Sequence, residues 1–206
     1  MSEQKNTLTA LPVMEQFYTL QGEGRYAGHA AYFIRLAGCD VGCVWCDVKE
    51  SWEVQPEQWM EIETIVSKAA SYPGRLAVIT GGEPLMYDLS ALTAALKKAG
   101  FRTHIETSGA YPLSGDFDWI CVSPKKFKAP LEEVVAQADE LKVVVFNNSD
   151  FDWAEKHAAM ARPVCQLLLQ PEWGRRGRME TDLVEYVKRH PEWVLSVQTH
   201  KYLDIP

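Results

Sequence analysis

The chain has 206 residues, a length that suits one domain. Its formal net charge of −7 at pH 7 excludes the broad basic surface that nucleic-acid binding requires. No run of roughly 18 apolar residues predicts a membrane span, and the polar start lacks the apolar segment of a secretory signal. We therefore expect a cytoplasmic protein with neither nucleic acid nor membrane as a partner, with residues 1–12 forming a flexible tail on a single domain.

Hydrophobic periodicity predicts two strands, over residues 15–20 and 31–36, and then a helix over residues 57–70. From Arg75 onward, short apolar runs alternate with helical patterns. The expected strands cover residues 76–80, 101–106, 119–122, 140–146, 164–170 and 193–199. The expected helices cover residues 89–99, 131–136, 152–160 and 182–189, and the basic run at residues 175–178 is interpreted as a loop.

Strands that alternate with helices predict a parallel sheet with right-handed crossovers. About six repeating strands are too few for a closed eight-stranded barrel, so we predict an α/β fold, a partial (β/α)6-type open TIM-like barrel. Polar segments follow the strands at Thr80-Gly81-Gly82-Glu83, Glu106-Thr107-Ser108-Gly109, Ser123-Pro124-Lys125 and Gln198-Thr199-His200. Because these ends meet at one rim, we expect the functional site, with any metal-binding loop, at the C-terminal strand ends.

Three of the five cysteines lie close together, as Cys39, Cys43 and Cys46 in a C-x3-C-x2-C pattern. Three thiolates can hold three irons of a 4Fe–4S cluster and leave the fourth iron free to bind a ligand. A zinc site and plain buried thiols are the alternatives, although structural zinc usually takes four protein ligands and no second cysteine pair follows. Cys121 and Cys165, each within an expected strand, are interpreted as core residues.

A second motif, Thr80-Gly81-Gly82-Glu83-Pro84, follows a predicted buried strand. Its glycines allow the backbone to approach a ligand closely. Its carbonyl groups and Glu83 can accept hydrogen bonds from an ammonium group. Together with the cysteine pattern upstream, the motif favours the cluster over zinc.

These two motifs resemble the radical S-adenosylmethionine superfamily. Residues 17–24, residues 33–39, the strand-end motifs and the ending Gln198-Thr199-His200-Lys201 resemble, over nearly the whole chain, the 7-carboxy-7-deazaguanine synthase family. The resemblance implies a radical lyase that converts 6-carboxy-5,6,7,8-tetrahydropterin to 7-carboxy-7-deazaguanine with loss of ammonia, in queuosine and deazapurine biosynthesis. It also implies a reducing electron donor such as flavodoxin or ferredoxin, and a homodimer.

The resemblance further implies residue roles, with a 4Fe–4S cluster on the three cysteines and S-adenosylmethionine on the open iron. The residues expected to contact S-adenosylmethionine are Trp45, Cys46, Asp47, Gly82, Ser123, Pro124 and Lys125. Those expected to contact the substrate are Leu20, Gln21, Gly22, Arg35, Thr80 and Pro206, the last through its terminal carboxylate.

Arg35 and Val48 each carry a further expectation. The Arg35 guanidinium can bind the substrate carboxylate with two parallel hydrogen bonds, and a structural ion pair is the alternative. Many family members have Thr or Ser two residues after the third cysteine, where its hydroxyl helps bind Mg²⁺. Here that residue is Val48, which offers no oxygen, so a Mg²⁺ requirement is in doubt.

Two other functions stay open at this stage. One is a small radical enzyme that acts on a protein, such as a glycyl-radical activase, although the Gln-Gly-Glu-Gly and Gln-Thr-His-Lys segments argue against it. The other is a non-enzymatic zinc-binding or electron-transfer module.

Overall fold

A computed structural model of the chain describes residues 9–206, so most of the expected tail lies outside the described residues. Strand β1 (Ala10–Leu20) begins earlier than predicted, and its first three residues pair with strand β3 (Trp59–Glu61). Leu11 is fully buried in the core. The prediction of a flexible tail is therefore wrong for residues 10–12, because burial of Leu11 fixes this segment.

The described residues form a nine-stranded sheet in the order β3-β1-β2-β4-β5-β6-β7-β8-β9. After β2 (Ala30–Leu36), the strands are β4 (Leu76–Gly81), β5 (Arg102–Thr107), β6 (Trp119–Val122), β7 (Glu140–Val145), β8 (Gln166–Pro171) and β9 (Trp193–Leu195). Strand β2 and strands β4 to β9 run parallel, whereas β1 and β3 are antiparallel to their neighbours. The predicted partial, open barrel is confirmed: its six repeating strands are β4 to β9, and β2 adds a seventh parallel strand.

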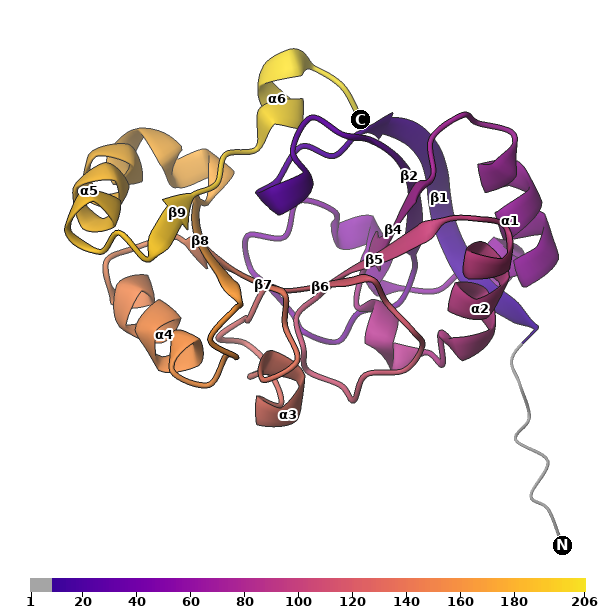
Figure 1. Ribbon diagram of the computed structural model, residues 1–206, viewed down its shortest axis with the longest axis horizontal. Coiled ribbons are helices and arrows are strands. Elements are labelled where there is room, and N and C mark those ends of the chain that lie inside the picture. Colours follow the sequence, from indigo (N-terminus) through magenta and orange to yellow (C-terminus); the bar gives the residue numbers. More distant parts are fainter. Residues whose placement is uncertain (1–8) are drawn as a thin grey trace, which may run out of the picture.

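Helices cover the outside of the curved sheet, as Figure 1 shows. They are α1 (Ile62–Ala70), α2 (Ser90–Lys98), α3 (Glu132–Val135), α4 (Ser149–Ala158) and α5 (Arg176–Arg189). Helix α6 (Thr199–Leu203) lies apart from them, and its first residue bonds to the Gly22 carbonyl. In the part of the chain that the structure describes, no helix is long and apolar enough to cross a bilayer.

Three elements differ from the predictions. The helix expected from residue 57 begins at Ile62, because residues 59–61 pair with β1 and extend the sheet. The basic run expected as a loop forms a 3-10 turn over residues 173–175 and the first turn of α5. The last strand ends at Leu195 instead of residue 199, since Thr199 bonds to the Gly22 carbonyl through both its backbone N–H and its hydroxyl and starts α6.

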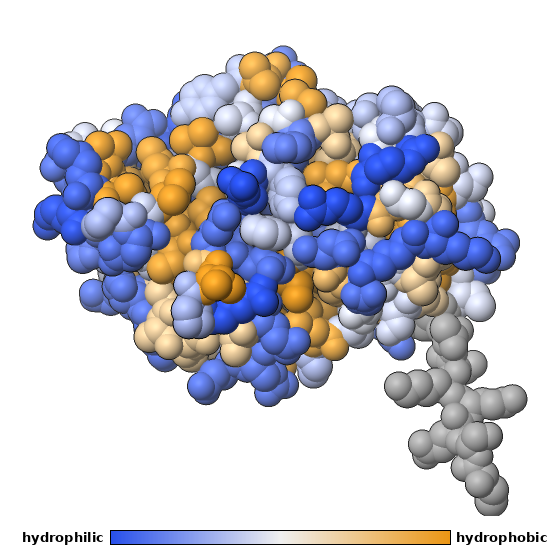
Figure 2. Space-filling view, viewed as in Figure 1, coloured by the Kyte–Doolittle hydropathy of each residue, from blue (hydrophilic) through white to orange (hydrophobic). Residues whose placement is uncertain are grey.

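Strand β9 forms one edge of the sheet and exposes apolar side chains. Val194, Leu195 and Val197 are all exposed. Figure 2 shows apolar residues on this side of the molecule, over the part that Figure 1 labels β9 and α5.

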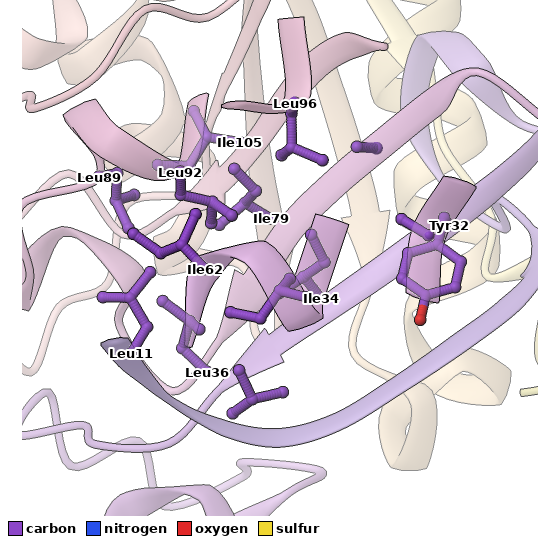
Figure 3. Packing of buried hydrophobic residues seen from close by; sticks show 14 of the residues in the cluster. Leu11, Tyr32, Ile34, Leu36, Ile62, Ile79, Leu89, Leu92, Leu96 and Ile105 are labelled. Atoms are coloured by element: carbon purple, nitrogen blue, oxygen red, sulfur yellow. The ribbon is translucent and has the colours of Figure 1, made fainter. Parts of the chain in front are cut away.

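The apolar core lies between the sheet and its outer helices, so the two faces of each strand differ. Ile79 and Ile105 pack with Leu92 and Leu96 of α2 (Figure 3). Because side chains alternate along a strand, the neighbours of these core residues point into the barrel. There, polar residues are buried: His104 and Glu140 are almost inaccessible, and Lys142 lies between the outward-facing Leu141 and Val143. The sheet thus supplies a core on one face and a polar interior on the other.

Candidate functional site

The three clustered cysteines line one cavity of about 240 Å³ at the C-terminal strand ends. Most residues predicted to contact S-adenosylmethionine line the same cavity: Trp45, Cys46, Asp47, Gly82, Ser123 and Lys125. Pro124 lines a neighbouring cavity with Phe127 and Trp45. The structure therefore brings the predicted cofactor residues together, with Pro124 set beside them.

The cysteine loop is fixed by backbone hydrogen bonds to two other segments. Gly38 and Cys39 donate to the carbonyl groups of Ser51 and Trp52, at 2.7 and 3.2 Å. The Glu83 N–H donates to the Gly38 carbonyl at 2.9 Å. The loop that follows β4 is thereby docked directly onto the loop that carries the thiols.

Gly82 is required by this docking. A Cβ atom at residue 82 would lie 2.2 Å from the Gly38 oxygen and 2.8 Å from the Cys39 Cβ, distances that real side chains do not adopt. The motif was expected to approach a ligand, and the structure shows that it first approaches the backbone of the cysteine loop. Gly82 is therefore needed to place the thiols.

The donor set fits a cluster better than a single ion. In the described part of the chain, at least two of the three thiol sulfurs lie more than 4.8 Å apart. A single zinc ion would draw its ligands closer than that, whereas a cluster binds each thiolate on a different iron. No fourth cysteine and no histidine lines this cavity in residues 9–206. Cys39, Cys43 and Cys46 thus suit a 4Fe–4S cluster with one iron left free.

Glu83 has a different environment from the one expected. Its side chain is only 1 % exposed, and its carboxylate accepts hydrogen bonds from the Thr107 hydroxyl and from both the N–H and the hydroxyl of Ser108, at 2.5–2.8 Å. The Leu85 N–H donates to it as well. Four hydrogen bonds from protein donors already satisfy the carboxylate. Glu83 therefore joins the ends of β4 and β5, and it does not have the free acceptor for a ligand ammonium group that the sequence predicted.

Lys125 and Trp45 close the other side of the cavity. The Lys125 ammonium donates to the Ser123 carbonyl and hydroxyl at 2.7 and 2.5 Å and lies 5.7 Å from the centre of the Trp45 ring. Burial lowers the pKa of Lys125 from its usual value. The flat indole beside the thiols provides a surface on which a planar ring can stack.

A second cavity, of about 290 Å³, adjoins the first. All the residues predicted to contact the substrate line it: Leu20, Gln21, Gly22, Arg35, Thr80 and Pro206. Figure 1 shows the C-terminus beside β1 and β2. Residues that follow β1 and the C-terminal Pro206 therefore line one cavity.

The two cavities share a wall, formed by Glu23, Asp47, Thr80, Glu106 and Gln198. Behind this wall, the Lys142 ammonium donates to Glu23 at 2.6 Å and to Glu106 at 2.9 Å. Gln198 donates to the other oxygen of Glu23 at 2.8 Å. Lys142 was not identified from the sequence, because a lysine in an apolar strand gives no local sign of its partners.

These contacts set the charge of the wall. Burial raises the pKa of Glu23, but the Lys142 ammonium and the hydrogen bonds from Lys142 and Gln198 outweigh burial and lower that pKa to about 2. Burial lowers the pKa of Lys142, but Glu106 and Glu23 raise it well above the usual value. At neutral pH the wall therefore carries a fixed ionised carboxylate on Glu23, held by a charged lysine.

Arg35 combines both interpretations made from the sequence. Its Nε donates to Glu15 at 2.5 Å, which is a structural ion pair across the β1–β2 ladder. Within the described residues, its terminal N–H groups have no hydrogen-bond partner, and the side chain lines the second cavity. Glu15 therefore leaves the outer part of the guanidinium available to an anion.

A loop with three thiols after a parallel strand, docked on a Gly-Gly segment at the end of a partial barrel, defines a radical S-adenosylmethionine protein. In agreement, the family described as the Radical SAM superfamily matches residues 33–118.

The chain belongs to the 7-carboxy-7-deazaguanine synthase family. It is 51% identical over 196 residues to the 7-carboxy-7-deazaguanine synthase of Flavobacterium psychrophilum, covering 95% of this chain and 93% of that protein. It is 37% identical to the enzyme of that name from Escherichia coli, covering 94% and 98% of the two chains. The crystal structure of QueE from Escherichia coli superposes with a TM-score of 0.83, at 33% identity, covering 93% of this chain and 95% of that one. These relatives do not favour a glycyl-radical activase or a non-enzymatic module.

We expect Gly82→Ala to reduce cluster assembly, because the new methyl group must displace the cysteine loop. Gly177→Ala is the matched control, since nothing lies within 4 Å of its added Cβ and it is in helix α5. Iron and sulfide per chain, measured after anaerobic reconstitution, should fall for the first variant and stay unchanged for the second. Equal loading of both variants would show that the loop tolerates a side chain at residue 82.

Lys142→Met should destabilise the fold by about 3–5 kcal/mol at pH 7, because it leaves buried carboxylates without a countercharge. The loss should shrink as the pH falls. In the wild type, the stability that comes from the low pKa of Glu23 is present above the usual pKa of 4.5 and is lost only toward pH 2. Without Lys142, burial raises the pKa of Glu23. Glu23 then takes up a proton at a higher pH, and the cost of burying its unpaired charge disappears.

Urea unfolding between pH 5 and 8 tests this expectation, with Lys188→Met as the control. Lys188 pairs with Glu185 on the exposed face of α5, so its loss should cost less than about 1 kcal/mol at any pH. A deficit for Lys142→Met that does not depend on pH would mean that Lys142 acts through packing alone.

Proposed function

We propose that the protein is a radical lyase that converts 6-carboxy-5,6,7,8-tetrahydropterin to 7-carboxy-7-deazaguanine with loss of ammonia. The observation that carries this proposal is the shared wall: the cavity lined by the three thiols and the cavity lined by the expected substrate residues meet at Glu23, Thr80 and Glu106. A substrate in the second cavity then lies next to the cluster and the S-adenosylmethionine that the first cavity would hold. The name of the relatives, 7-carboxy-7-deazaguanine synthase, gives the product.

Cys39, Cys43 and Cys46 would hold the 4Fe–4S cluster, and Trp45, Asp47, Gly82, Ser123 and Lys125 would line the place of S-adenosylmethionine. When bound, this pair of groups supplies an organic radical that removes a hydrogen atom from the substrate. The role of the chain is to hold the reacting carbon at the shared wall and to exclude water.

The second cavity suits a flat, polar heterocycle that carries a carboxylate. The stacked rings of Phe17 and Phe33, 5.2 Å apart, form an apolar wall beside Arg35. The outer N–H groups of Arg35 bind the substrate carboxylate, while Glu15 fixes the guanidinium from behind. Gln21 presents an amide that donates to Glu106 at 3.3 Å and accepts from the Glu23 N–H at 3.1 Å, so its orientation is set before the substrate arrives.

Glu23 and Glu106 face the ring edge that carries N–H donors. A carboxylate oxygen can accept more than one hydrogen bond, so each of these residues can still accept from the ring while Lys142 holds one of its oxygens. Pro206 lines the opposite side and adds a further acceptor. When Arg35 binds the carboxylate of the substrate and Glu23 and Glu106 bind its N–H edge, the ring has one orientation relative to the thiol cavity.

The decisive experiment is an anaerobic incubation of reconstituted protein with a low-potential reductant, S-adenosylmethionine and the carboxypterin, followed by product mass. The mass of 7-carboxy-7-deazaguanine should appear, and it should be absent from a Cys43→Ala sample. Cleavage of S-adenosylmethionine without any change in the pterin would keep the superfamily but overturn the proposed substrate.

We further propose that a one-electron donor such as flavodoxin or ferredoxin reduces the cluster, and that the protein is a cytoplasmic homodimer. The exposed apolar residues Val194, Leu195 and Val197 beside the edge strand β9 support self-association. The lack of a membrane-spanning helix in residues 9–206 is compatible with the proposed location.

Magnesium is proposed to be dispensable or only weakly required. Val48 and Asp47 both line the substrate cavity, but the Asp47 carboxylate is already paired with the Lys201 ammonium. A paired carboxylate is a poorer ligand for a cation that demands near-octahedral oxygen coordination.

Chelation of the wild type should therefore leave most of its activity, whereas Val48→Thr should make activity respond to added Mg²⁺. The measurement is turnover as a function of Mg²⁺ after treatment with chelator, in both proteins. Complete loss of wild-type activity on chelation, with full recovery on adding Mg²⁺, would contradict the proposal.

Arg35→Lys should raise the apparent KM for the carboxypterin roughly ten- to a hundred-fold, because a lysine keeps the charge and loses the fork of donors. Glu15→Gln is the matched comparison: it keeps an acceptor for Nε and should raise KM by a smaller factor. Cleavage of S-adenosylmethionine without pterin should be unchanged in both. An unaltered KM in Arg35→Lys would assign Arg35 to structure alone.

A further inference from the structure

The inner face of β5, β6 and β7 carries metal-binding atoms where barrels of this kind usually place branched apolar side chains. His104 and Glu106 lie two residues apart on β5 and therefore share a face. Cys121 on β6 is the register partner of Glu106, and Glu140 on β7 is the register partner of Cys121. Adjacent strands thus bring nitrogen, oxygen and sulfur donors to one layer.

These atoms converge more closely than the loop thiols do. One ligand atom each from His104, Glu106 and Cys121 lies within 4.8 Å of the others. Oε1 of Glu140 is 3.5 Å from the Cys121 sulfur but is not part of this converging group. His104, Cys121 and Glu140 are at most 1 % exposed, so this is an interior site and not a chance surface cluster.

His104 supplies an independent sign that a ligand belongs here. Within residues 9–206 neither of its ring nitrogens has a hydrogen-bond partner, although both are buried. The nearest acceptor, Oε1 of Glu106, is 3.6 Å from Nε2. A buried polar group without a partner costs about 1–3 kcal/mol, and an ion or a water molecule is the usual explanation.

The charge of the surroundings also favours a cation. Glu23, Glu106 and Glu140 are buried or nearly buried carboxylates in this interior, and the Lys142 ammonium pairs with the first two. Lys142 bonds to Oε2 of Glu106, which leaves Oε1 toward His104 with only a long contact of 3.3 Å from Gln21. Glu106 can therefore serve the lysine with one oxygen and a metal ion with the other.

We propose that His104, Glu106 and Cys121 bind one Zn²⁺ ion beneath the shared wall of the two cavities, with a fourth position left for water. A tetrahedral set of imidazole nitrogen, thiolate sulfur and carboxylate oxygen is typical of zinc. The ion fills the coordination of His104, offsets the excess negative charge, and fixes the carboxylate of Glu106 from behind. This site is separate from the cluster, and it does not depend on the identity of the substrate.

The test uses a chain without the cluster ligands, Cys39→Ser/Cys43→Ser/Cys46→Ser, so that bound metal reports on the inner site alone. After equilibration with Zn²⁺ and gel filtration, this protein should retain one zinc per chain. Added Co²⁺ should give thiolate-to-cobalt absorption. Cys121→Ala in this background should remove that absorption and weaken zinc binding by more than about 100-fold, since loss of even an outer-shell partner costs 10- to 100-fold.

Cys165→Ala is the matched control, because Cys165 is also a free thiol but lies outside the inner layer. It should leave zinc content and cobalt absorption unchanged. His104→Phe keeps the ring volume without the nitrogens. Zinc should raise the melting temperature of the triple-serine protein and should not raise that of its His104→Phe derivative.

If the triple-serine protein does not fold, zinc and iron per chain are measured in the holoenzyme instead. The Cys121→Ala and Cys165→Ala variants of the holoenzyme are then compared. Failure to retain zinc in both forms overturns the proposal, as does retention that neither Cys121→Ala nor His104→Phe alters. Because the readouts are metal content and thermal stability, a wrong substrate assignment would leave these results untouched.

Discussion

The buried ammonium group of Lys142 joins parts of the chain that are far apart in sequence. It lies on β7 and bonds to Glu23, in the loop after β1, and to Glu106, at the end of β5. Gln198, from the last segment, bonds to the same Glu23. A buried lysine is costly unless its partners are in place, so closure of the N-terminal loop and docking of the C-terminal segment are coupled to the same charge. The wall between the two cavities exists because this set of contacts is complete.

A second constraint acts through the backbone. The loop after β4 approaches the cysteine loop so closely that residue 82 must lack a side chain, and Glu83 then ties this loop to Thr107 and Ser108 at the end of β5. The thiols are therefore placed by neighbouring strand ends and not by the geometry of their own loop. This explains why chemistry-bearing segments from several strands form one site: each rigid strand presents its end, and short hydrogen bonds join the ends.

The alternation of side chains along the strands makes both the fold and the site possible. On β5, Ile105 packs into the core while His104 and Glu106 face the interior. On β7, Leu141 and Val143 pack outward while Lys142 faces inward. One sheet can thus bury apolar residues under its helices and still keep a charged, water-poor interior, where electrostatic interactions are stronger than at the surface. Glu106 lies in the same interior as His104 and Cys121 and also lines both cavities. The proposed zinc site and the substrate wall therefore share this residue.

The sequence by itself determined the repeating strands, the open parallel barrel and the three clustered thiols, because periodicity and short motifs are local properties of the chain. The residue sets expected at the two cavities came from the family resemblance, which matches the chain position by position. Only the tertiary structure decided the role of Lys142, whose partners are 119 and 36 residues away, and the saturation of the Glu83 carboxylate. The early start of β1 and the conversion of the last strand into α6 also depend on distant contacts, with β3 and with Gly22. A pattern records which face of an element is apolar; it does not record which charge or backbone group from elsewhere in the chain that face will meet.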